Sequence, residues 1–165
     1  CNYISEENNN YQYKTIIPCN LYGKYDHFDE SRSHLIAAII AKVHKAKEEG
    51  KDQINIWGKG NAKREFLYAG DLAEALIKCI NNFEKIPFSI NIGCDKDYSI
   101  LEYYNIISKI IGYKGLFEHD LTKPVGMMRK KISIEQQSII PWKATTSIEE
   151  GIAITYSYYL DHINR

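Results

Sequence analysis

The sequence has no CxxC pair, no excess of charge of either sign and no long apolar run. Its four cysteines, Cys1, Cys19, Cys79 and Cys94, are widely spaced. This spacing argues against a metal site or a disulfide framework and predicts a reduced, cytoplasmic protein with free thiols. Lys+Arg and Asp+Glu both count 21. We therefore expect neither nucleic-acid binding nor membrane binding, because non-specific binding to either surface needs a basic excess. No apolar run approaches the roughly 18 residues that span a bilayer, and no signal peptide is visible.

The chain also opens without an initiator methionine. Its first residues, CNYISEENNN, carry no helix-capping signal, and residues 1–7 could be the tail of a helix that began upstream. This pattern predicts that the 165 residues are the C-terminal part of a longer protein. The alternative is an ordinary mobile terminus.

Apolar periodicity predicts strands that alternate with helices. Strands are expected over residues 13–18, 54–57, 66–68 and 88–92, and a polar loop over 19–32. A helix is expected from Leu35 to near Gly50, and further helices after Asp71, Ser99 and Ser147, which each stand three residues before a glutamate, as in a capping box. Residues 118–131 have no regular pattern. This alternation is typical of the α/β or α+β class.

The stretch IIPCNLYGKYDHF places polar groups directly after a predicted strand. Ligands of open α/β sheets bind beyond the carboxyl ends of strands. Asn20 could therefore offer its amide to a carboxamide or a ribose, assisted by the backbone from Pro18 to Leu21. Alternatively, Asn20 caps a turn and Tyr22 packs in the core.

His34 stands at the predicted start of a helix, in SRSHLIAAIIAK. A histidine at this position can act as an acid or a base near neutral pH. The alternative is a histidine that only caps the helix or packs. The other four histidines show no metal-ligand spacing, so no metal site is predicted.

Two clusters of basic residues lie far apart in the sequence. WGKGNAKREF combines the flat ring of Trp57 with Arg64, and Lys130 lies between two other cations. An aromatic plane beside a guanidinium suits a nucleoside diphosphate, because the base or sugar stacks and the phosphates meet the guanidinium. Both clusters also fit a solvated surface.

Taken in order, these pieces resemble one family. NLYG-x-x-D-x-F and the SH pair, then WG-x-G and P-x-G-x-x-RK, resemble the C-terminal portion of the GDP-L-fucose synthase family. These enzymes are 3,5-epimerase-4-reductases of the extended short-chain dehydrogenase/reductase superfamily. REFLY-x-x-DLA and NIG support only the superfamily.

The resemblance implies a fold, a cofactor and a site. Residues 1–23 would be a remnant of the dinucleotide-binding domain, and 24–165 mainly a small α+β substrate domain, with about 65–92 returning to the Rossmann-type sheet. The cofactor would be NADP and the substrate a GDP-linked 4-keto-6-deoxysugar. The complete protein would be a homodimer that pairs through upstream helices. The implied site residues are Pro18, Cys19, Asn20, Leu21 and His34 for the cofactor, His34 as the catalytic acid, and Lys42, Trp57, Arg64 and Lys130 for the substrate.

Several positions depart from the family pattern. Cys19 stands where the family has threonine, and Val125, Met127 and Met128 stand where it has Asp and Thr-Pro. The exchange of a carboxylate for flexible apolar side chains indicates a different hexose or a larger sugar such as a 6-deoxy-heptose, or harmless drift. Two further functions remain open: an epimerase-only or reductase-only enzyme, and a non-catalytic nucleotide-sugar-binding module.

The resemblance also implies that catalytic parts lie outside this chain. The glycine-rich turn, the Tyr-x-x-x-Lys pair and the cysteine base of the family have no counterpart in it, and Cys1 would follow the Tyr-x-x-x-Lys helix. We therefore expect that these 165 residues alone do not oxidise NADPH with GDP-4-keto-6-deoxy-mannose. An absorbance assay checks this, and measurable turnover by the isolated chain would contradict it.

Overall fold

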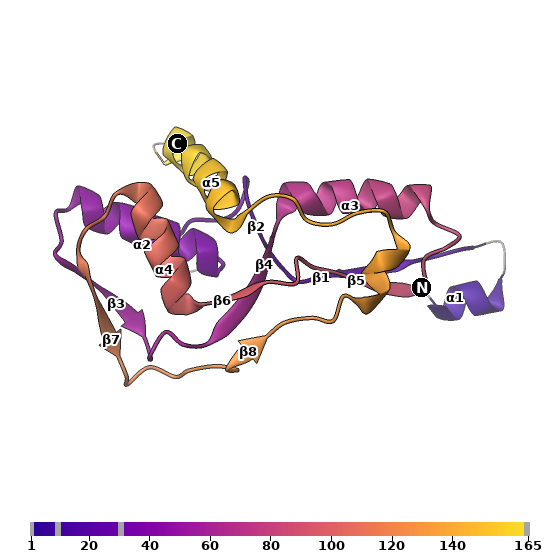
Figure 1. Cartoon of the computed structure of the whole chain (residues 1–165), viewed down its shortest axis with the longest axis horizontal. Coiled ribbons are helices and arrows are strands. Elements are labelled where there is room, and N and C mark those ends of the chain that lie inside the picture. Colours follow the sequence, from indigo (N-terminus) through magenta and orange to yellow (C-terminus); the bar gives the residue numbers. More distant parts are fainter. Residues whose placement is uncertain (1, 9–10, 30–31, 164–165) are drawn as a thin grey trace.

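The computed structural model describes residues 2–8, 11–29 and 32–163. Helices and strands alternate along it, which confirms the α/β class (Figure 1). The helices are α1 (Asn2–Glu7), α2 (Leu35–Glu48), α3 (Ala69–Asn81), α4 (Ile100–Ile111), the 3₁₀-helix η1 (Glu135–Ile139) and α5 (Ile148–His162). The strands are β1 (Thr15–Pro18), β2 (Asn20–Tyr22), β3 (Gln53–Trp57), β4 (Lys63–Tyr68), β5 (Ser89–Ile92), β6 (Asp97–Ser99), β7 (Leu116–Asp120) and β8 (Arg129–Lys130). Cys1 lies outside the described residues.

Strand pairing brings together segments that are distant in the sequence. β1 pairs in parallel with β5, from Thr15 opposite Ser89 to Pro18 opposite Ile92. β4 is the centre of a second sheet, with β2 and β8 parallel to it and β6 antiparallel. β3 pairs in parallel with β7. The segment predicted as a polar loop therefore begins with a strand, β2, which a three-residue polar and aromatic run does not reveal.

The molecule has two hydrophobic clusters, and β4 contributes to both. Phe66 packs in the cluster of α2, α4 and α5, whereas Leu67 packs in the cluster of α3, β1 and β5. Successive strand residues point to opposite faces, so one strand can serve two cores. Figure 1 shows α3 beside β1 and β5, and α2, α4 and α5 toward the opposite end of the molecule. The domain boundaries expected from the sequence stay a prediction.

The predicted capping boxes have different outcomes. The Ser99 box is confirmed: its hydroxyl accepts a hydrogen bond from the Glu102 amide, and the Glu102 carboxylate accepts one from the Ser99 amide. Ser147 also caps its helix, through the Glu150 amide. The Asp71 box is wrong, because α3 begins at Ala69. Asp71 instead lies in the first turn and is buried.

Asp71 joins α3 to the segment that precedes α5. Its carboxylate accepts hydrogen bonds from the amides of Thr145 and Thr146, each at 3.1 Å, and from the Thr146 hydroxyl at 2.6 Å. The sequence pattern identified an acidic residue near a helix start but not this tertiary partner.

Within the described residues, no helix is both long and apolar enough to cross a membrane. Cys19, Cys79 and Cys94 are free thiols.

We predict that Asp71→Asn destabilises the protein. An amide retains only one acceptor oxygen, so the change breaks charge-assisted hydrogen bonds and lowers the free energy of unfolding by about 1.5–3 kcal/mol. Urea denaturation followed by circular dichroism measures this change. Glu74→Gln, the same chemical change on the exposed face of α3, is the control and should stay within about 0.5 kcal/mol. Equal effects of the two variants would contradict the prediction.

Candidate active site

One cavity collects most of the residues that the sequence singled out. It has a volume of about 680 Å³ and lies where β1 and β2, the start of α2, β4 and β8 meet. Seven predicted site residues line it: Pro18, Cys19, Asn20, Leu21, His34, Arg64 and Lys130. The wall also includes Tyr22, Gly23, Lys24, Tyr25, Asp26, Leu35, Phe66, Ala69 and Ile100.

The strand-end residues are held by backbone and side-chain hydrogen bonds. The Cys19 amide donates to the carbonyl of Ile92 at 3.0 Å, which extends the β1–β5 pairing by one step. The Asn20 side chain donates to the carbonyl of Glu65 at 2.8 Å. This bond fixes the Asn20 amide at the cavity wall, beside the apolar surfaces of Pro18 and Leu21.

His34 occupies the N-cap position of α2 but forms no side-chain capping hydrogen bond. The imidazole is 75% exposed, and its Nδ1 lies 3.3 Å from the Asp26 carboxylate, which is only 11% exposed. The alternative of a capping or packed histidine is therefore wrong. A histidine oriented by a carboxylate and facing a cavity is suited to proton transfer.

Asp26 was not predicted from the sequence. Its signal was present as the aspartate of NLYG-x-x-D-x-F, but the spacing alone does not show that the loop folds back onto the helix start. Tyr25, which precedes it, has a positive φ of 69°, a conformation that is uncommon for residues other than glycine.

The two basic clusters meet across a pair of strands. Arg64 of β4 is the direct register partner of Lys130 of β8. Arg64 is fixed through its backbone, whose carbonyl accepts a hydrogen bond from the Tyr103 hydroxyl at 2.8 Å, and through its guanidinium, which donates to the Lys63 carbonyl at 2.7 Å. Two adjacent cations at one cavity wall are suited to a diphosphate.

Trp57 and Lys42 do not line this cavity. Trp57 ends β3 with its side chain 62% exposed, and the Lys123 ammonium lies 5.7 Å from its ring centre. The Lys42 ammonium donates to the carbonyl of Asn55 at 2.5 Å. Of the four substrate residues that the resemblance implies, Arg64 and Lys130 thus line the cavity, and the roles of Trp57 and Lys42 stay predictions.

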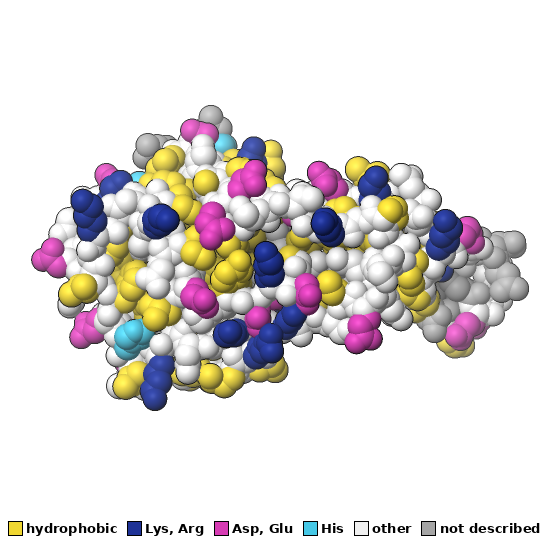
Figure 2. Space-filling model, in the orientation of Figure 1, with side chains coloured by type: hydrophobic (Ala, Val, Ile, Leu, Met, Phe, Trp, Pro, Cys, Tyr) yellow, Lys and Arg dark blue, Asp and Glu magenta, His cyan; other side chains and the backbone are white. Residues whose placement is uncertain are grey.

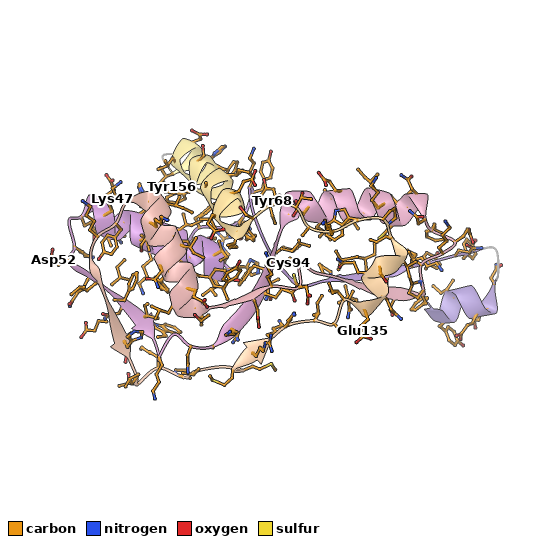
Figure 3. All side chains as sticks on the ribbon, viewed as in Figure 1. Lys47, Asp52, Tyr68, Cys94, Glu135 and Tyr156 are labelled. Carbon is orange, nitrogen blue, oxygen red and sulfur yellow. The ribbon has the colours of Figure 1, made fainter. Side chains whose placement is uncertain are left out.

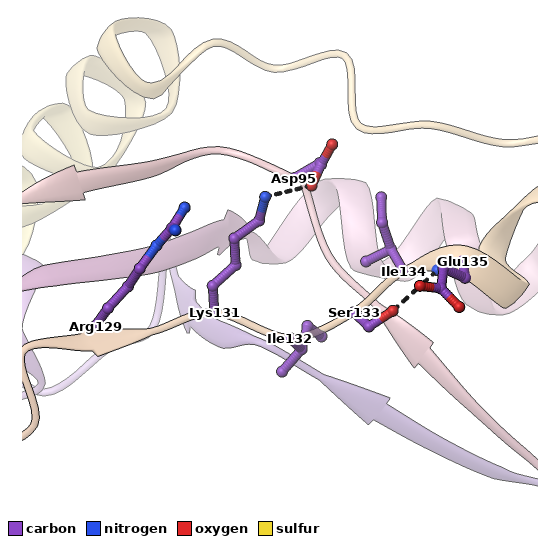
Figure 4. Close-up of a pocket in the computed structure, with 7 residues that line it drawn as sticks. All are labelled: Asp95, Arg129, Lys131, Ile132, Ser133, Ile134 and Glu135. Atoms are coloured by element: carbon purple, nitrogen blue, oxygen red, sulfur yellow. Dashed lines mark hydrogen bonds and ion pairs between the residues drawn. The ribbon is translucent and has the colours of Figure 1, made fainter.

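A second hollow, of about 510 Å³, lies on the other side of β8 (Figure 4). Its cations are already paired: Lys131 with Asp95 and Arg129 with Asp97, each at 2.5 Å. The hydrogen bond from Arg129 holds the pKa of the Asp97 carboxyl below its usual range. An anion would have to displace these carboxylates, so this hollow is a poorer anion site than the wall formed by Arg64 and Lys130. Ile132, Ser133, Ile134 and Glu135 complete its lining.

Basic and acidic side chains are interspersed over the face shown in Figure 2. The cations near the cavity thus act locally rather than through a large field of one sign.

Comparisons with known proteins identify the relatives of this chain. The sequence model of the NAD dependent epimerase/dehydratase family matches residues 1–93. A curated relative named GDP-L-colitose synthase, from Yersinia pseudotuberculosis, is 52% identical over 164 residues, covering 99% of this chain and 53% of the relative. A GDP-L-fucose synthase from Azorhizobium caulinodans is 47% identical over 160 residues, covering 97% of this chain and 51% of the relative.

The chain thus spans about half the length of the curated relatives it matches. Among solved structures, "MlghC, GDP-mannoheptose C4 reductase from Campylobacter jejuni with NADP bound" has a TM-score of 0.80 and 25% identity, covering 95% of this chain and 55% of that one. The resemblance to GDP-L-fucose synthases and the Rossmann-like fold class are confirmed. The match to more than half of its residues shows that the chain belongs to the NAD dependent epimerase/dehydratase family.

Proposed function

We propose that this chain is part of an NADP-dependent enzyme that epimerises a GDP-4-keto-6-deoxysugar at C3 and C5 and reduces its ketone. The observation that carries the proposal is the single cavity in which a strand-end amide, an aspartate-held histidine and a pair of adjacent cations meet. The names of the relatives, GDP-L-colitose synthase and GDP-L-fucose synthase, support a GDP-linked deoxysugar as substrate.

The cations and the histidine lie on different parts of the cavity wall, as the diphosphate and the sugar of such a substrate require. Arg64 and Lys130 would bind the diphosphate, and His34 lies in the loop and helix start that form another part of the wall. The C3 and C5 protons flank the 4-ketone and are therefore acidic enough to exchange. Epimerisation removes a proton from one face and returns one to the other, so two acid/base groups are required. Because Nδ1 of His34 faces Asp26, we assign proton donation to Nε2.

The residues present fit the nicotinamide end of a cofactor. Pro18 and Leu21 offer apolar surface for the ring, and the fixed amide of Asn20 offers hydrogen bonds to a carboxamide. When bound, the cofactor supplies the hydride that reduces the ketone. The solved relative with NADP bound supports NADP as that cofactor.

The identity of the sugar rests on the loop between β7 and β8. The side chains of Val125, Met127 and Met128 are 50%, 67% and 54% exposed. Val125 packs against Gly58: a Cβ atom added at Gly58 would lie 2.5 Å from Cγ2 of Val125. This apolar loop lies beside Arg64, because Gly126 of the loop is close to the Arg64 guanidinium. It favours a second candidate, an enzyme for a GDP-linked sugar other than the fucose precursor, such as a heptose. The name of the solved relative, GDP-mannoheptose C4 reductase, supports reduction alone as the reaction of this candidate.

We further propose that the complete protein is a homodimer that pairs through helices upstream of this chain. Size-exclusion chromatography with light scattering tests this, because the isolated 165 residues should then be monomeric.

We predict that Arg64→Gln weakens GDP binding. Loss of one charge-assisted contact to phosphate costs about 1.5–3 kcal/mol, or roughly a tenfold to hundredfold rise in Kd. Isothermal titration calorimetry of the complete polypeptide measures this. Lys63→Gln, at the adjacent position on the opposite face of β4, is the matched control and should change the affinity little. If both variants bind GDP equally well, Arg64 is not a substrate contact.

We predict that His34→Gln slows epimerisation by about 10²–10⁴-fold, the usual contribution of a general acid or base. Proton NMR of the sugar in deuterated water, with the complete polypeptide, follows deuterium entry at C3 and C5. Asp26→Asn should have a smaller effect in the same direction, because it removes only the group that orients the imidazole. His27→Gln, which changes an exposed histidine outside the cavity lining, is the control. Rapid exchange in His34→Gln would refute the assignment, and no exchange in the unmodified enzyme would favour the reductase-only candidate.

A further inference from the structure

Two cysteines lie at the carboxyl ends of neighbouring parallel strands. Cys19 follows β1 directly, and Cys94 stands two residues beyond the end of β5. The two strands end in register, Pro18 opposite Ile92, and the Cys19 amide is hydrogen-bonded to the Ile92 carbonyl. Neighbouring strands are about 4.8 Å apart, and Cys94 stands one residue beyond the position opposite Cys19, so we infer a Cα separation close to the range that a disulfide bridges.

The sulfur atoms also point to neighbouring acceptors. The Cys19 thiol donates to the Asn20 carbonyl at 3.5 Å, and the Cys94 thiol to the Phe66 carbonyl at 3.3 Å. Asn20 and Phe66 are direct partners across β2 and β4. Both thiols therefore converge on one pair of facing residues, and each thiol shifts the pKa of the other. Figure 3 labels Cys94 near the middle of the molecule, and Cys94 packs against the hydrophobic cluster that contains Cys19.

The two thiols differ in access and in acidity. Cys19 is 8% exposed and lines the cavity, whereas Cys94 is half-buried. The neighbouring Cys19 side chain lowers the pKa of the Cys94 thiol. The neighbouring Cys94 side chain, together with burial and the nearby Glu65 carboxylate, raises the pKa of Cys19. Since the thiolate is the reactive form, Cys94 is the residue that attacks first.

We propose that Cys19 and Cys94 are a thiol-modification site that forms a reversible disulfide by exchange with a low-molecular-weight disulfide such as oxidised glutathione. The Cys94 thiolate attacks one sulfur of glutathione disulfide, the glutathione S–S bond breaks, and one glutathione thiolate leaves. Cys19 then gives up its proton and attacks the Cys94 sulfur of the mixed disulfide, which releases the second glutathione. In total, the two protein thiols are oxidised by two electrons, and one glutathione disulfide is reduced to two glutathione thiols.

The disulfide would affect the candidate active site because Cys19 lines the cavity. It would link the cavity wall that carries Asn20 covalently to the loop after β5. The inference itself needs only the two thiols and their geometry, so it does not depend on the proposed function.

The test is a peptide map of the 165-residue chain after incubation with oxidised glutathione. We expect loss of the Cys19 and Cys94 thiols and a tryptic cross-link between residues 15–24 and 86–96, two hydrogens lighter than the free peptides. Dithiothreitol should restore both thiols. The peptide with Cys79, residues 79–85, is the internal control in the same digest and should stay reduced, because Cys79 is buried and burial raises the pKa of its thiol.

Three variants make the assignment specific. Cys94→Ser should prevent the cross-link. Cys19→Ser should also prevent it and leave one glutathionyl group on Cys94, because the resolving thiol is gone. Cys79→Ser should leave the cross-link unchanged. Circular dichroism checks that each variant keeps its fold. A cross-link to any other cysteine, or stable glutathionylation of Cys94 without a cross-link in the unmodified chain, would overturn the proposal.

Discussion

Glu65 is a fully buried carboxylate, and it accepts hydrogen bonds from backbone amides of two separate segments. One oxygen accepts from Cys94 and Asp95, each at 2.9 Å, and the other from Ile132 at 3.2 Å. A buried carboxylate without such partners would cost several kcal/mol, so these amides must stay in place for β4 to remain inside the molecule. The contact leaves no room for a side chain at Gly93, where a Cβ would lie 2.5 Å from Oε1.

The hydrogen bonds of Glu65 also fix the elements that carry the candidate active site. The residue before Glu65 is Arg64, which lines the cavity. The backbone carbonyl of Glu65 accepts a hydrogen bond from the side-chain amide of Asn20. The amide of Ile132 belongs to the segment that follows Lys130. The three elements that supply the strand-end amide and the two cations are thus fixed to one buried residue, Glu65, through its backbone or its carboxylate, which keeps the cations adjacent despite their mutual repulsion.

The sequence predicted features that depend on local periodicity. The helical stripe from Leu35 to Val43 and the Ser99 capping box were correct because both use contacts within a few residues. β2 and β7 were missed because short strands are stabilised by partners elsewhere in the chain, such as Phe66 opposite Asn20. Asp71 was misread for the same reason, since its carboxylate pairs with a segment more than 70 residues away. Most of the predicted site residues lie together, whereas the position of Trp57 depends on the β3–β7 pairing, which no local pattern indicates.

The position of β4 between two hydrophobic clusters limits how the molecule can move. Phe66 and Leu67 are consecutive residues buried in different cores, so a rigid rotation of one core against the other would have to break or bend a strand that both share. The loop that carries Asp26 is tied to the first of these cores as well, because the ring of Phe28 packs against Tyr159 of α5 with ring centres 4.8 Å apart. The shared strand and this aromatic contact hold the anion-binding wall and the proton-transfer wall in one geometry, so a ligand would meet a largely preformed site.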